Sequence, residues 1–495
     1  MTDAAANPAL PHRLDWDGGL LRVSAAPGAA IEIWLDDQPY ARLRADLSGQ
    51  IELALPLAPN GRERINLQLR TGNAQSAMVA LQFGRAGLAR AGEVLPLAPL
   101  IAQDFVDVAA RAAELRREVA IVVPVYNAPA AVAACLDSVL AQTRGPARLI
   151  VIDDASPDPA IAPLLARYAD RHGVTLLRNE NNLGFTATAN RGIEAAGRAD
   201  VVLLNADTEV AAHWLEGLRR AAWAAADTAS ATAVSDNAGA FSVPELEQHN
   251  PFPDNWIFGQ TALAVRQTAG SAYPYLPTGN GFCLYLKREA LDAVGLLDAR
   301  AFAQGYGEEN DWCQRAEAAG WRHVIAGDVL VRHARSQSFG DERRARLGEA
   351  GMAVLRERWP HYESEVGASL FSPRRRVLDW RVRKAYASAP PQPRRLYWEQ
   401  SDTTDAAGWH LQRDREGLLL RRPGAAPQLH ERLPEATVAT AAAQAGWNAS
   451  FARLLQIHAI DEVVGALPPA FAGIAQLLGV SNPVAPPSQP FGDDA

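Results

Sequence analysis

Acidic, amide-bearing and glycine-rich segments follow one another in a fixed order between Val119 and Gly340. Carboxylates can accept hydrogen bonds from a base or a ribose, hold a divalent cation, or take a proton from an attacking hydroxyl. Glycines let the backbone approach a ligand closely. Together these groups would hold a nucleotide, a cation and a diphosphate beside a carboxylate base, which is the chemistry of sugar transfer from a nucleotide-sugar. In chain order the segments are VAIVVPVYN, LIVIDDASPD, NENNLGF, VVLLNADTEV, LPTGNGF, YGEENDWCQR and VRH.

The elements that must position these residues follow a βαβ pattern. Apolar runs rich in β-branched residues alternate with amphipathic stretches, which predicts an α/β fold with a mostly parallel sheet and helices on both faces. Ligands of such sheets bind at the carboxyl ends of the strands, and the polar segments fall there. We predict strands at 120–126, 147–156, 173–179 and 199–207, and helices at 130–143, 161–173 and 185–197.

Two of the polar segments have a structural explanation as good as the ligand-binding one. Asp153 and Asp154 could accept hydrogen bonds from a nucleotide, but DDASPD is also good turn and N-cap chemistry. Gly184 precedes a predicted helix, so it permits either close approach to a ligand or a simple loop. The residues alone leave both alternatives open.

A metal site is predicted where Asn205 and Asp207 follow the run VVLL. A carboxylate beside a diphosphate needs a cation to offset its charge, and Mg²⁺ or Mn²⁺ takes oxygen ligands and bridges phosphates. The alternative is a strand end that is merely capped. His333 follows a strand-like run late in the segment, and its position is compatible with a metal contact or with a structural role.

Glu308, Glu309 and Asp311 form an acidic cluster ahead of a helical stretch. One of them could deprotonate an acceptor hydroxyl as it attacks the anomeric carbon. Acidic residues are also favourable in the first turn of a helix. We expect one of the three to serve the helix and another to serve the chemistry.

The ordered motifs resemble family 2 glycosyltransferases, which have the GT-A fold and invert the anomeric centre. The resemblance covers Val119 to Arg375. It implies a UDP- or dTDP-sugar donor, Mg²⁺ or Mn²⁺, and a glycan acceptor that is lipid-linked. The variants NNLGF and GEEND look most like bacterial enzymes, rhamnosyltransferases among them, that build O-antigen or other surface polysaccharides.

The resemblance also implies roles for individual residues. Glu309 would be the base, with Glu308 and Asp311 beside it, Asp207 would be the direct metal ligand, and His333 would complete the metal or diphosphate site. Two positions depart from the family pattern: Asn205 stands where its metal motif begins with Asp, and Glu309 stands where the base is usually Asp, which makes Glu308 a competing base. The implied nucleotide-sugar contacts are Pro124, Tyr126, Asn127, Asp153, Asp154, Asn182, Gly184, Asn205, Gly279 and Asn280.

The rest of the chain reads as accessory modules. Short alternating strands predict a β-sandwich-like module, and a stretch after the Pro-rich linker weakly resembles part of a GT-B glycosyltransferase domain. The predicted divisions are a β-rich module at 1–100, a helical connector at 101–118, the GT-A domain at 119–375, a basic and Pro-rich linker at 376–395, a small α/β module at 396–481 and a disordered tail at 482–495.

Composition excludes several classes of protein. A net charge of −8 over 495 residues argues against a global nucleic-acid binder. Three well-separated cysteines predict no disulfide framework and indicate a reducing cytoplasm. We expect no signal peptide and no membrane span. The basic residues Arg374 to Arg376, Arg381, Arg383 and Lys384 could touch anionic lipid at the inner membrane face, although a solvated helix face is the preferred interpretation.

Two other functions remain as alternatives. A non-catalytic scaffold that binds glycan or nucleotide would also fit the altered metal motif and the β-rich module. A nucleotidyltransferase would normally carry a Gly-rich, basic phosphate loop after the first strand, and VPVYNAPAAV has none.

Overall fold

The structure is a computed structural model that divides into two compact units. One unit comprises Met1–Gln103 and Phe371–Ser388, and the other comprises Asp104–Leu370 and Ala389–Ala495. The residues that the structure describes are 13–17, 20–54, 64–72, 74–76, 78–84, 87–90, 93–95, 105–270, 273–303, 305–334, 341–399, 408–414, 417–422, 429–434 and 441–482.

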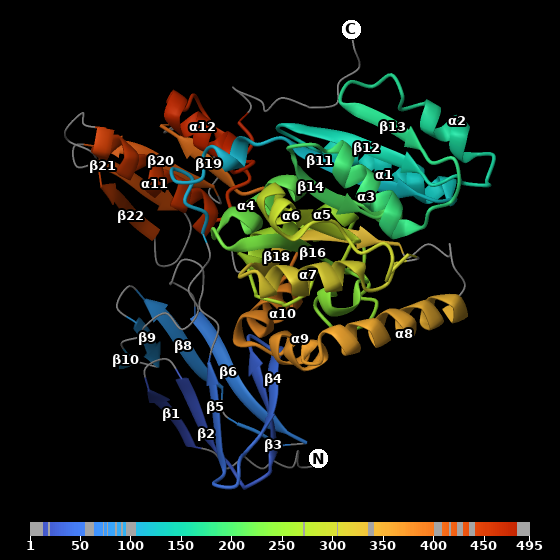
Figure 1. Cartoon of the computed structure of the whole chain (residues 1–495). Coiled ribbons are helices and arrows are strands. Elements are labelled where there is room, and N and C mark those ends of the chain that lie inside the picture. The colour runs from blue at the N-terminus through green and yellow to red at the C-terminus, as the bar shows by residue number, and fades with distance from the viewer. Residues whose placement is uncertain are drawn as a thin grey trace. The chain divides into compact units, whose positions relative to one another are not determined.

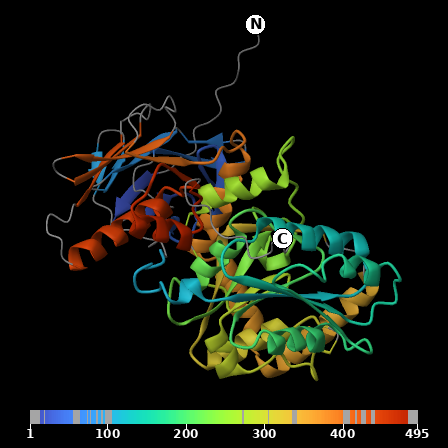
Figure 2. The same cartoon turned by 90° about the horizontal axis from the view of Figure 1, so that it is seen from above.

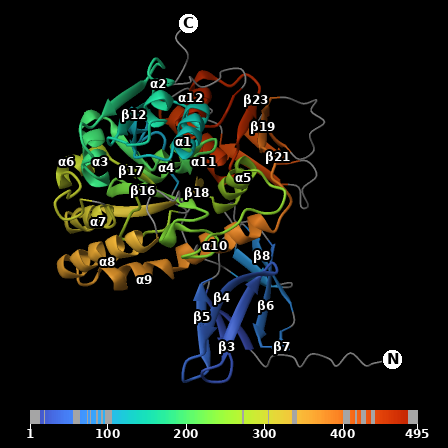
Figure 3. The same ribbon diagram turned by 90° about the vertical axis from the view of Figure 1, so that its right-hand side faces the viewer.

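The first unit contains the predicted β-rich module (Figures 1 and 3). One sheet has the order β1-β2-β5, and a second has the order β10-β9-β8-β6-β3-β4 with β7 paired to β6. Buried side chains from both sheets, such as Val23 and Ile33, form one core. The strands are β1 (Arg13–Asp17), β2 (Leu20–Ser24), β3 (Ala30–Leu35), β4 (Gln38–Arg44), β5 (Gln50–Ala54), β6 (Arg64–Thr71), β7 (Ala74–Gln75), β8 (Val79–Gly84), β9 (Gly87–Arg90) and β10 (Glu93–Leu95).

The basic segment predicted as a linker from 376 is instead part of helix α10 (Pro373–Tyr386), which belongs to this same unit. Val377 and Trp380 join the β core, and the Trp380 indole donates to the Leu35 carbonyl at 3.1 Å. Apolar residues hidden among the arginines therefore decide where this segment lies.

Several basic side chains of α10 are bonded within the unit instead of lying in solvent. Arg375 is fully buried and pairs with Asp379 at 2.9 Å, while Arg381 is also buried. Lys384 pairs with Asp36 at 2.9 Å. These three cations do not form the solvated helix face that we expected, and they leave less charge for a lipid surface than the sequence suggests.

The second unit is built on a large mixed sheet with the order β13-β12-β11-β14-β17-β16-β18-β15. Strands β11 to β14, β16 and β18 share one direction, and β17 and β15 run against it. This confirms the α/β fold with a mostly parallel sheet. The strands are β11 (Val119–Val125), β12 (Ala147–Asp153), β13 (Val174–Arg178), β14 (Asp200–Leu204), β15 (Thr208–Glu209), β16 (Thr228–Ser235), β17 (Cys283–Leu286) and β18 (Arg322–His333).

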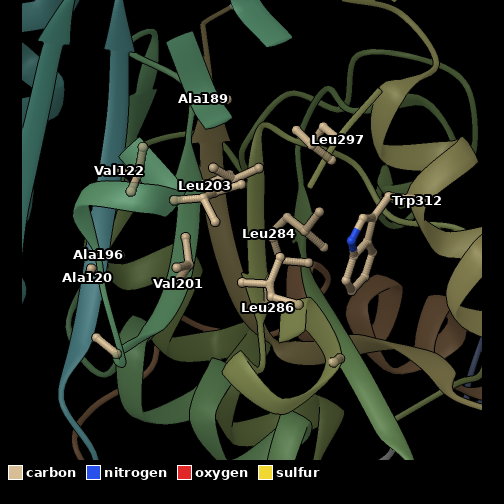
Figure 4. Packing of buried hydrophobic residues seen from close by; sticks show 14 of the residues in the cluster. Ala120, Val122, Ala189, Ala196, Val201, Leu203, Leu284, Leu286, Leu297 and Trp312 are labelled. Atoms are coloured by element: carbon tan, nitrogen blue, oxygen red, sulfur yellow. The ribbon is translucent and has the colours of Figure 1, made fainter. Parts of the chain in front are cut away.

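Helices lie on both sides of this sheet, as predicted (Figure 2). Side chains of α3, α6 and α7 meet those of the central strands in one core, where Trp312 packs near Leu284 and Leu286 (Figure 4). Helices α4 and α5 contact β18. The helices are α1 (Pro129–Gln142), α2 (Ile161–Ala166), α3 (Phe185–Ala195), α4 (Trp214–Trp223), α5 (Phe258–Ala269), α6 (Arg288–Val294), α7 (Glu308–Ala318), α8 (Asp341–Arg358) and α9 (Tyr362–Leu370).

The C-terminal module belongs to the same unit as the large sheet. Its own sheet has the order β22-β21-β20-β19-β23 and is accompanied by α11 (Ala441–Ile457) and α12 (Pro469–Leu477). Arg266 of α5 pairs with Asp461 of this module, and Arg220 of α4 donates to the Leu478 carbonyl at 2.7 Å. Its strands are β19 (Arg395–Trp398), β20 (Trp409–Asp414), β21 (Gly417–Arg422), β22 (Leu429–Pro434) and β23 (Glu462–Val464).

One local prediction in this unit was wrong. The helical connector contains a 3-10 turn, η1 (Glu114–Arg116), and Val106 is held by backbone hydrogen bonds to the Gln456 side chain. After α11 the chain forms strand β23, which pairs with β19 over a long sequence separation. The predicted tail from 483 onward lies outside the described residues. Within the described part of the chain, no helix combines the length and the apolar character that crossing a membrane requires.

Helix α3 can lie close to the sheet only because residue 192 is glycine. A Cβ at Gly192 would be 2.2 Å from Val122 Cγ1. We expect Gly192→Ala to lower the free energy of unfolding by about 1–3 kcal/mol through overpacking. Gly367→Ala in α9 is the control, because nothing lies within 4 Å of its Cβ position. Urea unfolding measures both, and equal stabilities would show that α3 shifts away without cost.

Candidate active site

The sequence-predicted polar residues gather at one edge of the large sheet. The parallel strands β11, β12, β14 and β18 all end there, in front of Tyr126, at Asp153, in front of Asn205 and at His333. Strand β17 runs in the opposite direction, so the segment that precedes it, at 278–282, reaches the same edge. Helix α7, which begins at Glu308, packs against this part of the sheet. The site is therefore assembled by strand direction.

Both carboxylate oxygens of Asp154 accept hydrogen bonds from the protein itself. Its Oδ1 accepts hydrogen bonds from Asn179 Nδ2 at 2.7 Å and from the Leu183 amide at 2.8 Å, and its Oδ2 accepts from the Gly184 amide at 3.0 Å. The exposed Asn182 side chain accepts from the same Gly184 amide at 3.2 Å. Asp154 therefore holds the NENNLGF loop in place, and neither it nor the Gly184 amide is directed at a nucleotide.

Asp153 and Asn127 are joined through Ser156. The Ser156 amide donates to Asp153 Oδ1 at 2.9 Å, and the Ser156 hydroxyl accepts from the Asn127 amide at 2.9 Å. Arg178 lies 3.4 Å from the other carboxylate oxygen of Asp153. Pro124 and Tyr126, on the same strand and loop, are partly buried. Asp153 thus remains the better candidate of the two aspartates for a nucleotide contact.

Asp207 and His333 are brought together by a short strand pairing. Thr208 of β15 is the direct partner of His333 at the end of β18. As a result, Asp207 Oδ1 lies 3.3 Å from His333 Nε2. Both side chains are only slightly exposed, 18% for Asp207 and 13% for His333. Asn205 is partly buried at the start of the same turn, where its carbonyl accepts from the Thr208 hydroxyl at 2.7 Å.

The orientation of the His333 ring leaves its Nε2 facing Asp207. The Asn237 carbonyl lies 3.0 Å from Nδ1 and can only accept, so Nδ1 carries a proton. The ring also stacks on Phe282, with centroids 5.4 Å apart. An imidazole fixed in this way by a backbone carbonyl presents Nε2 as a metal ligand.

The residues at this position fit a divalent cation in part. Asp207 and His333 offer one oxygen and one nitrogen on the same side, which suits Mg²⁺ or Mn²⁺ with further oxygen ligands. No cluster of three or more His, Cys, Asp or Glu side chains suited to a metal occurs among the described residues. Any cation here would therefore take its remaining ligands from water and phosphate oxygens.

Sequence reasoning missed a third group at this edge, the loop that follows β16. Asp236 accepts a hydrogen bond from the His333 amide at 2.9 Å, and Asn250 anchors the loop by donating its amide to the Asp236 carbonyl at 2.8 Å. The signal was present: Asp236 and Asn237 follow the end of β16, just as Asn205 and Asp207 follow the end of β14. A nearby strand end with polar residues could have been included on that ground.

The TGNGF segment connects the metal pair to the acidic cluster. The Gly281 amide is 3.4 Å from Glu309 Oε1, and the next residue, Phe282, carries the ring that stacks on His333. A Cβ at Gly279 would be 2.9 Å from Leu284 Cδ1, so this glycine is needed for packing. The partly buried Asn280 accepts from the Phe282 amide at 3.1 Å and shapes the turn.

Glu308, which is buried, and Glu309, which is partly buried, form a carboxyl pair at the start of α7. Burial raises the pKa of Glu308 well above its ordinary value, and the neighbouring charge of Glu309 raises it further. Glu308 is therefore the member that keeps its proton and can donate it to Glu309. Neither Glu308 Oε2 nor Glu309 Oε2 has a hydrogen-bond partner among the described residues. Because Glu308 holds its proton, we take Glu309 as the candidate base.

Asp311 is a structural residue. Its carboxylate is fully buried and accepts from Arg315 at 2.9 Å, from Arg358 at 3.0 Å and from the Trp359 indole at 3.1 Å. These bonds connect α7 to the end of α8. Asp311 therefore has no free oxygen for an acceptor hydroxyl, and we assign it the positioning of α7.

Comparison with known families identifies part of this unit. Residues 120–295 match the family model for glycosyl transferase family 2. This matched stretch runs from β11 to the end of α6, so it contains the strands that carry the nucleotide-side residues. The match includes the strand ends up to β17 and stops before Glu309 and His333.

Curated relatives match over limited stretches. The chain is 24% identical over 248 residues to the glycosyltransferase AglE of Haloferax volcanii, which covers 48% of this chain and 73% of AglE. It is 31% identical over 93 residues to the uncharacterized glycosyltransferase YibD of Escherichia coli, which covers 19% of this chain and 27% of YibD. Thus the matched stretch spans less than a third of YibD.

Two solved structures are similar in outline. A mannosyltransferase from Pyrobaculum calidifontis, in complex with GDP-Man and Mn²⁺, has a TM-score of 0.38 and 20% identity, and the match covers 55% of this chain and 76% of that one. GalNAc-T7 with UDP, GalNAc and Mn²⁺ also has a TM-score of 0.38, with 18% identity over 50% of this chain and 49% of that one.

The Glu308 pKa predicts a pH-dependent contribution to stability. The pKa of Glu308 is higher in the folded protein than in the unfolded chain. Its contribution to the free energy of unfolding is therefore fully present below the pKa of an ordinary glutamate, and it is lost as the pH rises toward the pKa of the folded protein. We expect the melting temperature of the natural protein, relative to Glu308→Gln, to fall as pH rises from 4 to about 8. The exposed Glu180→Gln is the control, and the same pH trend in both variants would contradict the assignment.

Proposed function

We propose that this chain is an inverting glycosyltransferase that moves a sugar from a nucleoside-diphosphate sugar to a hydroxyl of a glycan acceptor. One observation carries the proposal. The Gly281-Phe282 dipeptide contacts Glu309 with its first residue and His333 with its second. A carboxylate base and a metal-binding pair therefore lie on either side of one turn, as a reaction between a hydroxyl and a diphosphate-activated carbon requires.

Asp207 and His333 are the residues that would hold a divalent cation. When bound, Mg²⁺ or Mn²⁺ would offset the charge that develops on the departing diphosphate. The Asn237 carbonyl and the Phe282 ring keep His333 in the orientation this needs. Asn205, which replaces the first acidic residue of the family motif, leaves Asp207 as the carboxylate of that turn.

Glu309 is the proposed base. As the acceptor oxygen bonds to the anomeric carbon, the bond from that carbon to the diphosphate oxygen breaks, and the hydroxyl proton passes to Glu309. Attack opposite the leaving group inverts the anomeric centre. Glu308 retains its own proton, because burial raises its pKa, and so does not compete for the acceptor proton.

The nucleotide side of the site is proposed at Pro124, Tyr126, Asn127 and Asp153, on adjoining strand ends. Asp154 acts behind them by holding the loop at 179–184. From the motif resemblance we infer a UDP- or dTDP-sugar, and an acceptor that is a lipid-linked glycan of surface polysaccharide synthesis at the cytoplasmic face of the membrane. Positioning of both substrates would supply much of the rate.

Removal of the metal ligand is expected to uncouple donor binding from the cation. Asp207→Ala should weaken Mn²⁺-dependent binding of UDP-sugar at least about tenfold, because a ligand carboxylate is lost. Glu209→Ala is the matched control: it lies two residues away on β15 and pairs with Arg332 at 2.9 Å. Calorimetric titration with and without Mn²⁺ measures the effect, and unchanged metal dependence in Asp207→Ala would reject the ligand role.

Removal of the base should abolish transfer while donor binding persists. Glu309→Gln is expected to lower kcat by about 10²- to 10⁴-fold, since the amide cannot take the acceptor proton. Glu317→Gln, on the same helix and bonded to the Tyr275 hydroxyl at 2.8 Å, is the control. The readout is release of nucleoside diphosphate in the presence of acceptor. If Glu309→Gln turns over at the natural rate, Glu309 is not the base.

A further inference from the structure

A cavity lies at the edge of the large sheet opposite the proposed active site. Its volume is about 310 Å³. It is lined by residues that precede β11 and β12, by the first turn of α4, and by the chain that follows α12. The proposed active site occupies the carboxyl ends of the same strands, so the two sites are separated by the length of the sheet. Nothing in the proposed transfer reaction uses this cavity.

Glu216 is the polar group that marks the cavity as a ligand site. It lines the cavity, is only 5% exposed, and its Oε2 has no hydrogen-bond partner among the described residues. A buried carboxyl oxygen without a partner is costly and is normally satisfied by a donor. Burial also raises the pKa of Glu216, so this carboxyl can donate as well as accept.

The chain is built so that Glu216 borders this space. A Cβ at Gly479 would lie 2.7 Å from Glu216 Cγ, so only glycine, which also has φ of +69°, leaves room for the carboxyl. His213, one turn earlier, is hydrogen-bonded to the backbone of Gly479. The C-terminal module therefore closes one side of the cavity and fixes the position of the acidic group.

The other charged groups of the cavity are positive. Arg116, Arg144 and Arg219 line it, and the first turn of α4 adds the partial positive charge of a helix N-terminus. Arg219 is 3% exposed, and its Nε has no partner among the described residues, although its Nη2 lies 3.3 Å from the Pro146 carbonyl. Guanidinium groups in such a setting bind phosphate or carboxylate.

We propose that this cavity binds an acidic monosaccharide, a sugar phosphate or a uronic acid. The guanidinium groups of Arg116, Arg144 and Arg219 contact the anion, and Glu216 bonds to a sugar hydroxyl. A volume of about 310 Å³ lies at the small end of ligand pockets and suits one sugar ring with its acidic group. This inference is independent of the transfer reaction, because it uses none of the residues of the proposed active site.

Binding to the full chain tests the proposal. Thermal unfolding is followed with glucose 1-phosphate and with glucuronic acid, which differ in their anionic group. The controls are glucose, which has the sugar ring without an anion, and inorganic phosphate, which has the anion without a sugar. At least one acidic sugar should raise the unfolding temperature, with an affinity at least about tenfold above that of either half. The better of the two identifies the anion. Equal binding of inorganic phosphate would overturn the sugar part, and no shift with either acidic sugar would overturn the whole.

Variants of single residues test whether the acidic sugar binds in this cavity. Ala212→Trp, at an exposed alanine that lines the cavity, should abolish the shift, and Glu216→Gln and Arg144→Gln should each weaken it about tenfold. Ala134→Trp, at an exposed alanine of α1 outside the cavity, should not change it. Asp207→Ala should also keep the full shift. Loss of the shift in Asp207→Ala, or its retention in Ala212→Trp, would assign the binding to another site and overturn the proposal.

Discussion

The pairing of β15 with the end of β18 is the constraint on which the proposed active site depends. It joins Thr208 to His333 and so places two candidate metal ligands of this edge, Asp207 and His333, 3.3 Å apart. The remaining contacts make that arrangement rigid. Asp236 and Asn237 hold the backbone and the ring of His333, and Phe282 covers the ring. A two-residue strand thus decides the geometry of the proposed reaction centre.

The acidic residues of this edge divide by what they touch. Asp154 and Asp311 each accept three hydrogen bonds from the protein and stabilise a loop and a helix. Glu309 keeps an oxygen without a partner among the described residues, beside a neighbour that retains its proton. An oxygen that already accepts hydrogen bonds from the protein is not open to a substrate hydroxyl, whereas an oxygen without a partner is. This difference separates structural acids from the proposed base better than their spacing does.

The C-terminal module bonds to helices α4 and α5 and forms one side of the cavity near Glu216. Asp461 pairs with the buried Arg266, and the Leu478 carbonyl accepts a hydrogen bond from the buried Arg220. Gly479 leaves room for the Glu216 side chain beside the cavity. Removing one partner of a buried ion pair is expensive, and the module and the sheet belong to one compact unit. The weak resemblance of this module to another glycosyltransferase fold therefore says less about it than its contacts do.

Local sequence determined the α/β alternation, the parallel core strands and the polar strand ends, because buried strands and amphipathic helices follow from the periodicity of apolar residues. It also predicted that polar residues follow the ends of the strands, and in the structure Asn205 follows β14 and Asp153 ends β12. Only the tertiary structure decided that the carboxylates of Asp154 and Asp311 are hydrogen-bonded within the protein. It also decided that α10 packs on the β core through Trp380 and that β23 is a strand. These outcomes depend on partners far apart in sequence, and local pattern contains no information about such partners.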